Sequence, residues 1–410
     1  MNGLGRRIFF KTFGCRTNQY DTEFLKSQLT RAGYEVVYDP DEADVVVVNS
    51  CAVTHKAERE SRREVRRHVK NGKEVIYTGC AAKVNPYDLA HFSGSVEDVL
   101  RYLGVEEYGP LQGFTRARGI LKVQEGCDFA CSYCVIRFAR GRSRSVPLER
   151  ILKDAEGLIS TTREITLTGT QIGDWGREWG MDLSDLLSIL TERYPNVRFR
   201  LSSIAPVHIT ERLLRVMTER ENVCPHLHVS VQSGSDRILR AMARPYTREF
   251  YERKLRLIYS FDPDMAVGTD VIVGFPGETE EDFEATLDLV REYPFAYVHA
   301  FEYSPRPGTP AYGLREVPAP VRKERMRRIQ DLISEKRKAY RRRFLGRVLN
   351  VYAETYDGGM VSGTSENYLK VVFPADEGVV GEIVPVRVTE DRGTGLLVGE
   401  VVGVETSKAV

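Results

Sequence analysis

Short apolar segments alternate with helical segments over most of this 410-residue chain. The segment ADVVVVNSC contains a near-continuous β-branched run, which is typical of a strand buried on both faces of a parallel sheet. RRIFFKTFGC and EVIYTGC lie before and after it, and each strand ends at a cysteine that a helical segment follows. The pattern predicts a small α/β domain with a parallel sheet over residues 1–105.

A second series of strands and helices is predicted between residues 117 and 343. Its strands are GILKVQE, EITLTGT, RFRLSSI, HLHVSVQ, AVGTDVIVGF and YVHAFEY, and helical segments separate them. Six βα units are too few for a complete eight-fold barrel. The pattern therefore predicts a partial (βα)6 barrel with its functional loops at the carboxyl ends of the strands.

The last region, residues 344–405, has short strands separated by Gly, Asp and Asn, which predict a small antiparallel β-barrel. A helix from about Pro320 to Phe344 precedes it and is rich in Arg and Lys. Cations beside an OB-like barrel can bind the phosphates of a folded RNA. Such charges also occur on ordinary solvated helices, so the helix alone does not decide the matter.

Composition excludes several other classes of protein. Fifty-nine basic residues nearly balance 58 acidic ones, so the net charge of +1 indicates no acidic partner. No apolar segment is long enough for a signal peptide or a membrane span, and a cytoplasmic location is expected. Seven cysteines, an odd number, argue against a disulfide framework and leave metal binding, nucleophilic catalysis or packing.

Three cysteines lie close together in QEGCDFACSYC, at positions Cys127, Cys131 and Cys134. Thiolates are the preferred ligands of iron–sulfur clusters, and this C-x3-C-x2-C loop gives three irons of a [4Fe–4S] cube a protein ligand. The fourth iron is left for a small molecule, which in radical-SAM enzymes is S-adenosylmethionine (SAM). The alternative is a zinc loop that lacks its fourth ligand.

A second trio, Cys15, Cys51 and Cys80, follows three predicted parallel strands. The carboxyl ends of such strands lie on one edge of a sheet, so these thiols are expected to converge on a second cluster. The alternative is three separate packing cysteines. Cys224 fits neither set and is expected to be a packing residue.

The chain resembles the methylthiotransferase family of radical-SAM enzymes over almost its whole length. The similar motifs are TFGCRTNQYDTE, VVNSCAVTHKAERES, YTGCAAK, EGCDFACSYC and GFPGETEEDF, and the last region resembles a TRAM barrel. The resemblance implies two [4Fe–4S] clusters and SAM, with one SAM supplying a methyl group and another a radical. Arg137 stands where the family usually has proline.

The resemblance also implies a SAM pocket. Its expected members are Tyr133, Gly169, Thr170, Gln171, Ser203, Gln232, Arg244, Asp270 and Gly274. Each of them could instead make an ordinary turn or strand-end hydrogen bond. Tyr303, Arg306, Arg142 and Arg144 are expected near the target nucleoside.

NQYDTE, LKVQEGC and ARGRSRS are similar to the branch that acts on N6-threonylcarbamoyladenosine (t6A) at position 37 of tRNA. This implies the anticodon stem-loop of ANN-decoding tRNA as partner and a flavodoxin- or ferredoxin-type electron donor. The sulfur donor is not identifiable from the sequence. Alternative substrates are N6-isopentenyladenosine (i6A) at position 37 and an aspartate of a ribosomal protein, and a non-catalytic iron–sulfur protein that binds RNA is a different alternative.

Overall fold

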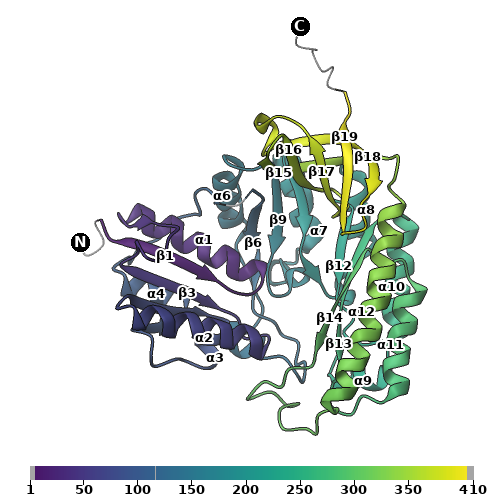
Figure 1. Ribbon diagram of the computed structural model, residues 1–410, viewed down its shortest axis with the longest axis horizontal. Coiled ribbons are helices and arrows are strands. Elements are labelled where there is room, and N and C mark those ends of the chain that lie inside the picture. The colour runs from purple at the N-terminus through teal and green to yellow at the C-terminus, as the bar shows by residue number, and fades with distance from the viewer. Residues whose placement is uncertain (1–4, 116, 404–410) are drawn as a thin grey trace.

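The structure of the protein is a computed structural model that describes residues 5–115 and 117–403. The first four residues of the predicted N-terminal domain (1–4) and the last two of the predicted C-terminal barrel (404–405) lie outside the described residues. Figure 1 shows an N-terminal α/β domain beside a central barrel and a small β-barrel at one end of the latter. None of the described helices is long and apolar enough to cross a membrane.

The N-terminal domain contains a parallel sheet with the strand order β2-β1-β3-β4-β5. Its strands are β1 Arg7–Thr12, β2 Glu35–Val36, β3 Val45–Ser50, β4 Glu74–Gly79 and β5 Phe92–Gly94, and its helices are α1 Arg16–Arg31, α2 His55–Lys70, α3 Cys80–Val84 and α4 Val96–Tyr102. Every residue of β3 is buried, as its β-branched run predicts. The predicted α/β domain is therefore confirmed.

The central region is a parallel sheet in two segments, ordered β10-β9-β6 and β11-β12-β13-β14. The strands are β6 Gly119–Lys122, β9 Glu164–Thr168, β10 Arg198–Leu201, β11 Ser203–Ile204, β12 His226–Val229, β13 Ala266–Val273 and β14 Tyr297–Glu302. β10 and β11 are one predicted strand interrupted at Ser202, so the predicted set of six is found. β14 is an edge strand, because the barrel is incomplete.

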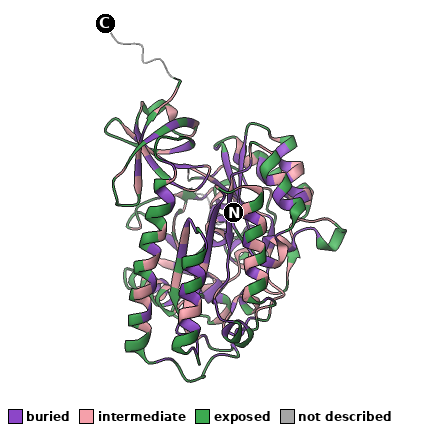
Figure 2. Ribbon diagram, turned by 90° about the vertical axis from the view of Figure 1, so that its right-hand side faces the viewer, coloured by how far each residue is buried: buried purple, intermediate pink, exposed green. Residues whose placement is uncertain are grey.

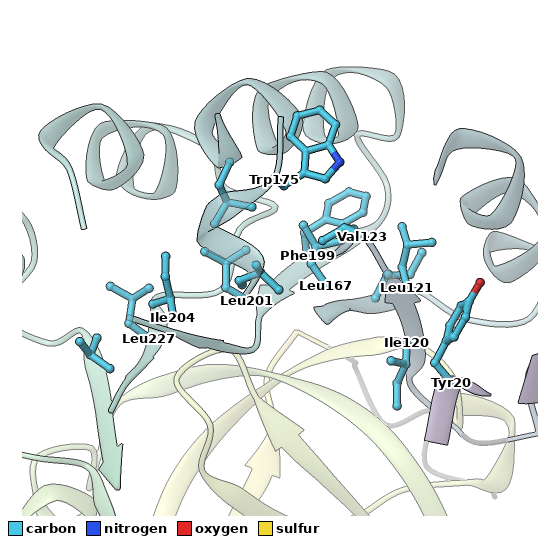
Figure 3. Close-up of a cluster of buried hydrophobic side chains, with 14 of the residues drawn as sticks. Tyr20, Ile120, Leu121, Val123, Leu167, Trp175, Phe199, Leu201, Ile204 and Leu227 are labelled. Carbon is cyan, nitrogen blue, oxygen red and sulfur yellow. The ribbon is translucent and has the colours of Figure 1, made fainter. Parts of the chain in front are cut away.

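Helices surround these strands. They are α5 Ile136–Arg140, α6 Leu148–Ile159, α7 Leu183–Arg193, α8 Glu211–Glu219, α9 Asp236–Ala241, α10 Arg248–Phe261 and α11 Glu280–Glu292, with short 3-10 turns η1 Ile172–Asp174, η2 Arg177–Trp179 and η3 Pro206–His208 and a small hairpin of β7 Gln124–Glu125 and β8 Arg144–Ser145. Leu167, Phe199 and Leu201 pack in one buried cluster with Tyr20 of α1 (Figure 3). The N-terminal domain thus shares its core with the barrel.

The C-terminal region is a closed barrel with the order β15-β16-β17-β19-β18. Its elements are β15 Val348–Asp357, β16 Met360–Ser365, β17 Lys370–Pro374, η4 Glu377–Val379, β18 Ile383–Asp391 and β19 Leu396–Val401. Four strand pairs are antiparallel as predicted, but β17 and β19 pair in parallel. Helix α12, Ala319–Arg342, leads into this barrel and exposes its outer side (Figure 2).

A buried ion cluster joins the C-terminal barrel to the central one. Glu164 of β9 is fully buried and binds Arg198 at 2.7 Å and Arg200 at 3.0 Å. The two guanidinium groups also donate to main-chain oxygens of the C-terminal barrel, including those of Asn350 and Ser365. The two arginines hold the pKa of Glu164 far below its usual range, in spite of the opposing effect of burial.

We predict that Glu164→Gln destabilises this junction by about 3–5 kcal/mol, because two buried guanidinium groups lose their counter-charge. Denaturant unfolding at pH 7 measures the loss, and Glu149→Gln at an exposed site should change little. Because the pKa of Glu164 is lowered by folding, its contribution is present above the unfolded value of about 4.3 and is lost as pH falls toward the folded value. The variant should therefore show a shallower loss of stability in acid, and an unchanged acid profile would contradict this role.

Candidate iron–sulfur and SAM site

The loop between β7 and α5 carries Cys127, Cys131 and Cys134. Gly126 begins it with a φ of +77°, and a Cβ there would lie 1.9 Å from the main-chain oxygen of Arg142. Only glycine fits this close approach. Burial, together with the neighbouring Cys131 and Cys127, raises the pKa of Cys134 to about 12. The Cys134 thiol is therefore protonated at neutral pH without a metal, and binding of a metal there must release a proton.

The three cysteines line a cavity of about 180 Å³ at the carboxyl ends of the barrel strands. Its other predicted members are Tyr133, Thr170, Gln171, Ser203, Gln232 and Arg244. Thr170 Oγ1 is buried without a hydrogen-bond partner, which leaves a polar atom available to a ligand. Three thiols beside such an atom fit an iron–sulfur cluster with a polar small molecule on its open iron.

Arg244 places a positive charge against the cysteine loop. Its Nη1 donates to Cys131 Sγ at 3.1 Å, and its Nε donates to Tyr246 at 2.7 Å. The guanidinium also lies 5.7 Å from the centre of the Phe129 ring. Hydrogen bonds to cluster sulfurs are one of the means by which proteins set cluster potentials, so Arg244 is suited to that role.

Gln232 adopts a left-handed backbone conformation with a φ of 78°. Its main chain nevertheless stays in the sheet, because its N–H donates to Asp270 and its carbonyl accepts from Ile272, each at 2.9 Å. Such conformations are strained for residues with a side chain and concentrate at functional sites. The strain directs the Gln232 side chain to the cavity at the end of β12.

Three predicted members of the SAM pocket lie outside the cavity lining. Gly169 packs against Gln124, where a Cβ would meet the main-chain oxygen at 2.7 Å. Gly274 faces the Arg322 side chain of α12, not a ligand. Asp270 lies on β13, where it accepts from Ser230 Oγ at 2.8 Å. Gly169 and Gly274 thus allow close packing within the protein.

Sequence reasoning missed Phe129, Ile136, Ile204, Ala205 and Ser230, which also line the cavity. Ser230 had a usable signal, because it lies two residues before Gln232 and strand side chains alternate between faces. The apolar members gave no signal, since they look like ordinary core residues in the sequence.

The second cysteine trio converges at the carboxyl edge of the N-terminal sheet, next to the barrel. Cys15 precedes α1, Cys51 follows β3 and Cys80 follows β4. A Cβ on Gly14 would lie 3.0 Å from Cys51 Sγ, so the chain before Cys15 touches Cys51. Burial raises the pKa of Cys51 to about 11, with Cys80 and Cys15 adding to the effect. The thiols are thus neighbours, as a shared metal site requires.

Arg140 connects the two cysteine sites. It is the last residue of α5, the short helix that follows the loop with Cys134, and its Nε donates to Cys80 Sγ at 3.2 Å. The same guanidinium donates to Asn18 at 2.6 Å and Asp21 at 2.8 Å. A cavity of about 250 Å³ opens beside Cys80 and Arg140, between the two domains. The helix that follows the first cysteine loop therefore contacts the second trio across the domain boundary.

Other expected positions have different surroundings. Tyr303 is a core residue whose hydroxyl donates to Ala311 at 2.9 Å, and Arg306 is buried against Glu58 of α2. Neither lies on an open surface, in contrast to the expected nucleoside contacts. Arg142 and Arg144 are exposed.

Two further expectations concern single positions. Cys224 is fully buried beside the ion cluster around Arg200, and burial raises its pKa to about 11. It lies in the junction with the C-terminal barrel, as a packing residue would. Arg137 is the second residue of α5, in the first helical turn, where the helix needs no N–H donor. Proline and arginine therefore suit the same backbone there.

Half of the ten cations of α12 are paired with carboxylates. Arg325 binds Glu278, Arg328 binds Glu280 and Glu284 of α11, and Arg341 binds Asp391. The helix therefore presents far less free positive charge than its sequence suggests. Among the described residues, five cations of α12 have no carboxylate partner: Lys323, Lys336, Arg337, Lys338 and Arg342.

Comparisons with known proteins agree with this architecture. Residues 7–100 match the family described as Uncharacterized protein family UPF0004, and residues 121–290 match the Radical SAM superfamily. A solved radical S-adenosylmethionine methyltransferase, TsrM from Kitasatospora setae, is similar in fold with a TM-score of 0.54. It is 15% identical, with 75% of this chain and 77% of that chain covered. The fold and site thus define a radical-SAM protein with an additional N-terminal domain.

Full-length relatives identify the family. The threonylcarbamoyladenosine tRNA methylthiotransferase MtaB of Thermotoga maritima is 38% identical, with 96% of both chains covered. The enzyme of the same name from Bacillus subtilis is 35% identical over 93% of both chains. The chain belongs to the threonylcarbamoyladenosine tRNA methylthiotransferase family. Membership implies a [4Fe–4S] cluster and SAM.

We predict that each cysteine trio holds its own cluster. The wild-type protein, reconstituted without oxygen, should bind about eight irons per chain, and Cys51→Ala and Cys131→Ala should each bind about four. Iron and sulfide analysis with electron paramagnetic resonance measures this. Cys224→Ala is the matched control and should keep the full content, whereas a loss of all iron from either trio variant would contradict two independent sites.

Proposed function

We propose that this protein converts t6A at position 37 of tRNA to 2-methylthio-N6-threonylcarbamoyladenosine, in the cytoplasm. Relatives that carry this activity in their names cover nearly the whole chain. The single observation that supports the chemistry best is the hydrogen bond from Arg140, in the helix that follows the first cysteine loop, to Cys80 Sγ of the second trio. A radical source and a sulfur site need this proximity, because the methylthio group must reach the carbon from which hydrogen is removed.

Cys127, Cys131 and Cys134 would hold the cluster that binds SAM, and Cys15, Cys51 and Cys80 would hold the second cluster. When bound, the first cluster supplies the electron that cleaves SAM to a 5′-deoxyadenosyl radical, and the second offers an open iron for the sulfur species. Thr170, Gln171 and Gln232 would bind the polar groups of SAM. Arg244 and Arg140 would orient the cysteine loops and donate to their sulfurs.

The electron would come from a flavodoxin- or ferredoxin-type protein. Exposed cations near the cysteine loop support this, because Arg142 and Arg144 can attract an acidic redox partner as well as tRNA phosphates. The anticodon stem-loop would reach the barrel on the side where β14 leaves it open.

We predict that the two trios have separable roles in the reaction. With t6A-containing tRNA, SAM and reductant, the wild-type protein should form the methylthio nucleoside, as measured by nucleoside mass spectrometry. Cys131→Ala should abolish both 5′-deoxyadenosine and the product, while Cys51→Ala should retain 5′-deoxyadenosine but give no product. Parallel reactions with i6A tRNA and with the ribosomal-protein substrate test the substrate, and product from either of these but not from t6A would overturn the assignment.

A further inference from the structure

The inner face of the edge strand β14 has no role in the site described so far. Tyr297, His299 and Phe301 alternate along the strand and point to one face. His299 and Phe301 are 47% and 45% exposed, which is unusual for adjacent rings inside a barrel. Their rings meet edge to face at 6.3 Å. The strand thus presents a half-open aromatic surface at the edge of the sheet.

One end of this surface adjoins the SAM cavity. Asp270 of β13 binds His299 at 3.3 Å and also accepts from Ser230, which lines the cavity. His228 holds the second oxygen of Asp270 at 2.9 Å. Two consecutive hydrogen bonds therefore connect the SAM cavity with the His299 ring and fix the orientation of that ring.

The other end of the surface leads into a cavity of about 240 Å³ between β14, α12 and the C-terminal barrel. Tyr297, His299 and Tyr368 line it, together with the cations Arg337, Arg341 and Lys370. The ring of Tyr297 lies over Gly268, where a Cβ would be 2.1 Å from the ring. Only a residue without a Cβ leaves room for this ring, so Gly268 lets Tyr297 line the cavity.

The cations of this cavity differ in their partners. Arg341 is paired with Asp391 at 3.1 Å, and Lys370 is paired with Glu354 at 2.5 Å. Arg337 has no carboxylate partner among the described residues, and its Nη2 only approaches the main-chain oxygen of Val298 at 3.4 Å. One guanidinium at the edge of β14 is thus available for an anion, and its planar fork suits a carboxylate.

The length of the aromatic surface along β14 fits a long planar ligand. Phe301 and Tyr297 are four residues apart on one strand, which places them about 13 Å apart along β14. A purine stacked on His299 and Phe301 would direct an extended N6 substituent toward Arg337. Enzymes that modify a base commonly take it out of the helix and stack it on aromatic side chains.

We propose that β14 is the binding site of the target nucleoside, with the adenine on His299 and Phe301 and the carboxylate of its N6 substituent on Arg337. This inference rests on the proposed function and adds the residues that distinguish an anionic N6 substituent from an uncharged one. Arg337 then determines specificity through binding, because it lies at the end of β14 remote from the SAM cavity.

The test compares t6A tRNA with tRNA in which the threonyl carboxylate is converted to the amide. The wild-type holoenzyme should favour the acid by about tenfold or more in kcat/KM, the usual effect of a hydrogen bond to a charged group. Arg337→Ala should remove this preference by raising KM for the acid alone, and Arg337→Lys should restore part of it. Lys338→Ala removes an exposed cation of the same helix that does not line the cavity and should leave the preference unchanged.

Phe301→Ala separates stacking from carboxylate recognition. It should weaken binding of the acid and amide stem-loops equally, by about tenfold in fluorescence anisotropy, because stacking does not depend on the substituent charge. If wild type and Arg337→Ala preferred the acid over the amide tRNA equally, the inference would be overturned. An unchanged affinity of Phe301→Ala for the stem-loops would overturn it as well. A wild-type protein that fails to convert t6A at all would instead contradict the proposed function, so the two failures are distinguishable.

Discussion

The buried guanidinium of Arg140 is the contact on which the arrangement of the two cysteine sites depends. Arg140 belongs to α5, the helix that follows Cys134, and its guanidinium donates to the sulfur of Cys80 and to the carboxylate of Asp21. Lys122 of β6 binds the same carboxylate at 2.9 Å, so Asp21 has two cationic partners and its pKa is lowered despite full burial. Losing one partner of such a buried ion cluster is strongly destabilising, so the cluster holds the two domains in one relative position.

Strand-end placement explains why the cysteines were predictable. Cys15, Cys51 and Cys80 each follow a parallel strand, and parallel strands bring their carboxyl ends to one edge whatever their separation in sequence. The same rule located Thr170, Gln171 and Gln232. It could not decide the direction of Asp270, because alternation along β13 turns that side chain toward His228 and His299 from neighbouring strands.

Long-range charge pairing was the main feature that the sequence could not reveal. The arginines of α12 are neutralised by Glu280 and Glu284 of α11 and by Asp391 of the C-terminal barrel, which lie far away in the chain. Only the folded arrangement shows which cations of the helix, Arg337 among them, are left without a carboxylate partner. Tyr303 is a similar case, since its burial depends on the turn that brings Ala311 to its hydroxyl.

The ion cluster of Glu164 binds the C-terminal barrel through main-chain oxygens of Asn350, Ser365 and Glu366. A carbonyl oxygen is present whichever side chain a position carries. The attachment therefore constrains the path of the barrel's backbone and leaves most of its side chains unconstrained. Substitutions on the outer surface of this barrel can accumulate without altering its angle to the central barrel.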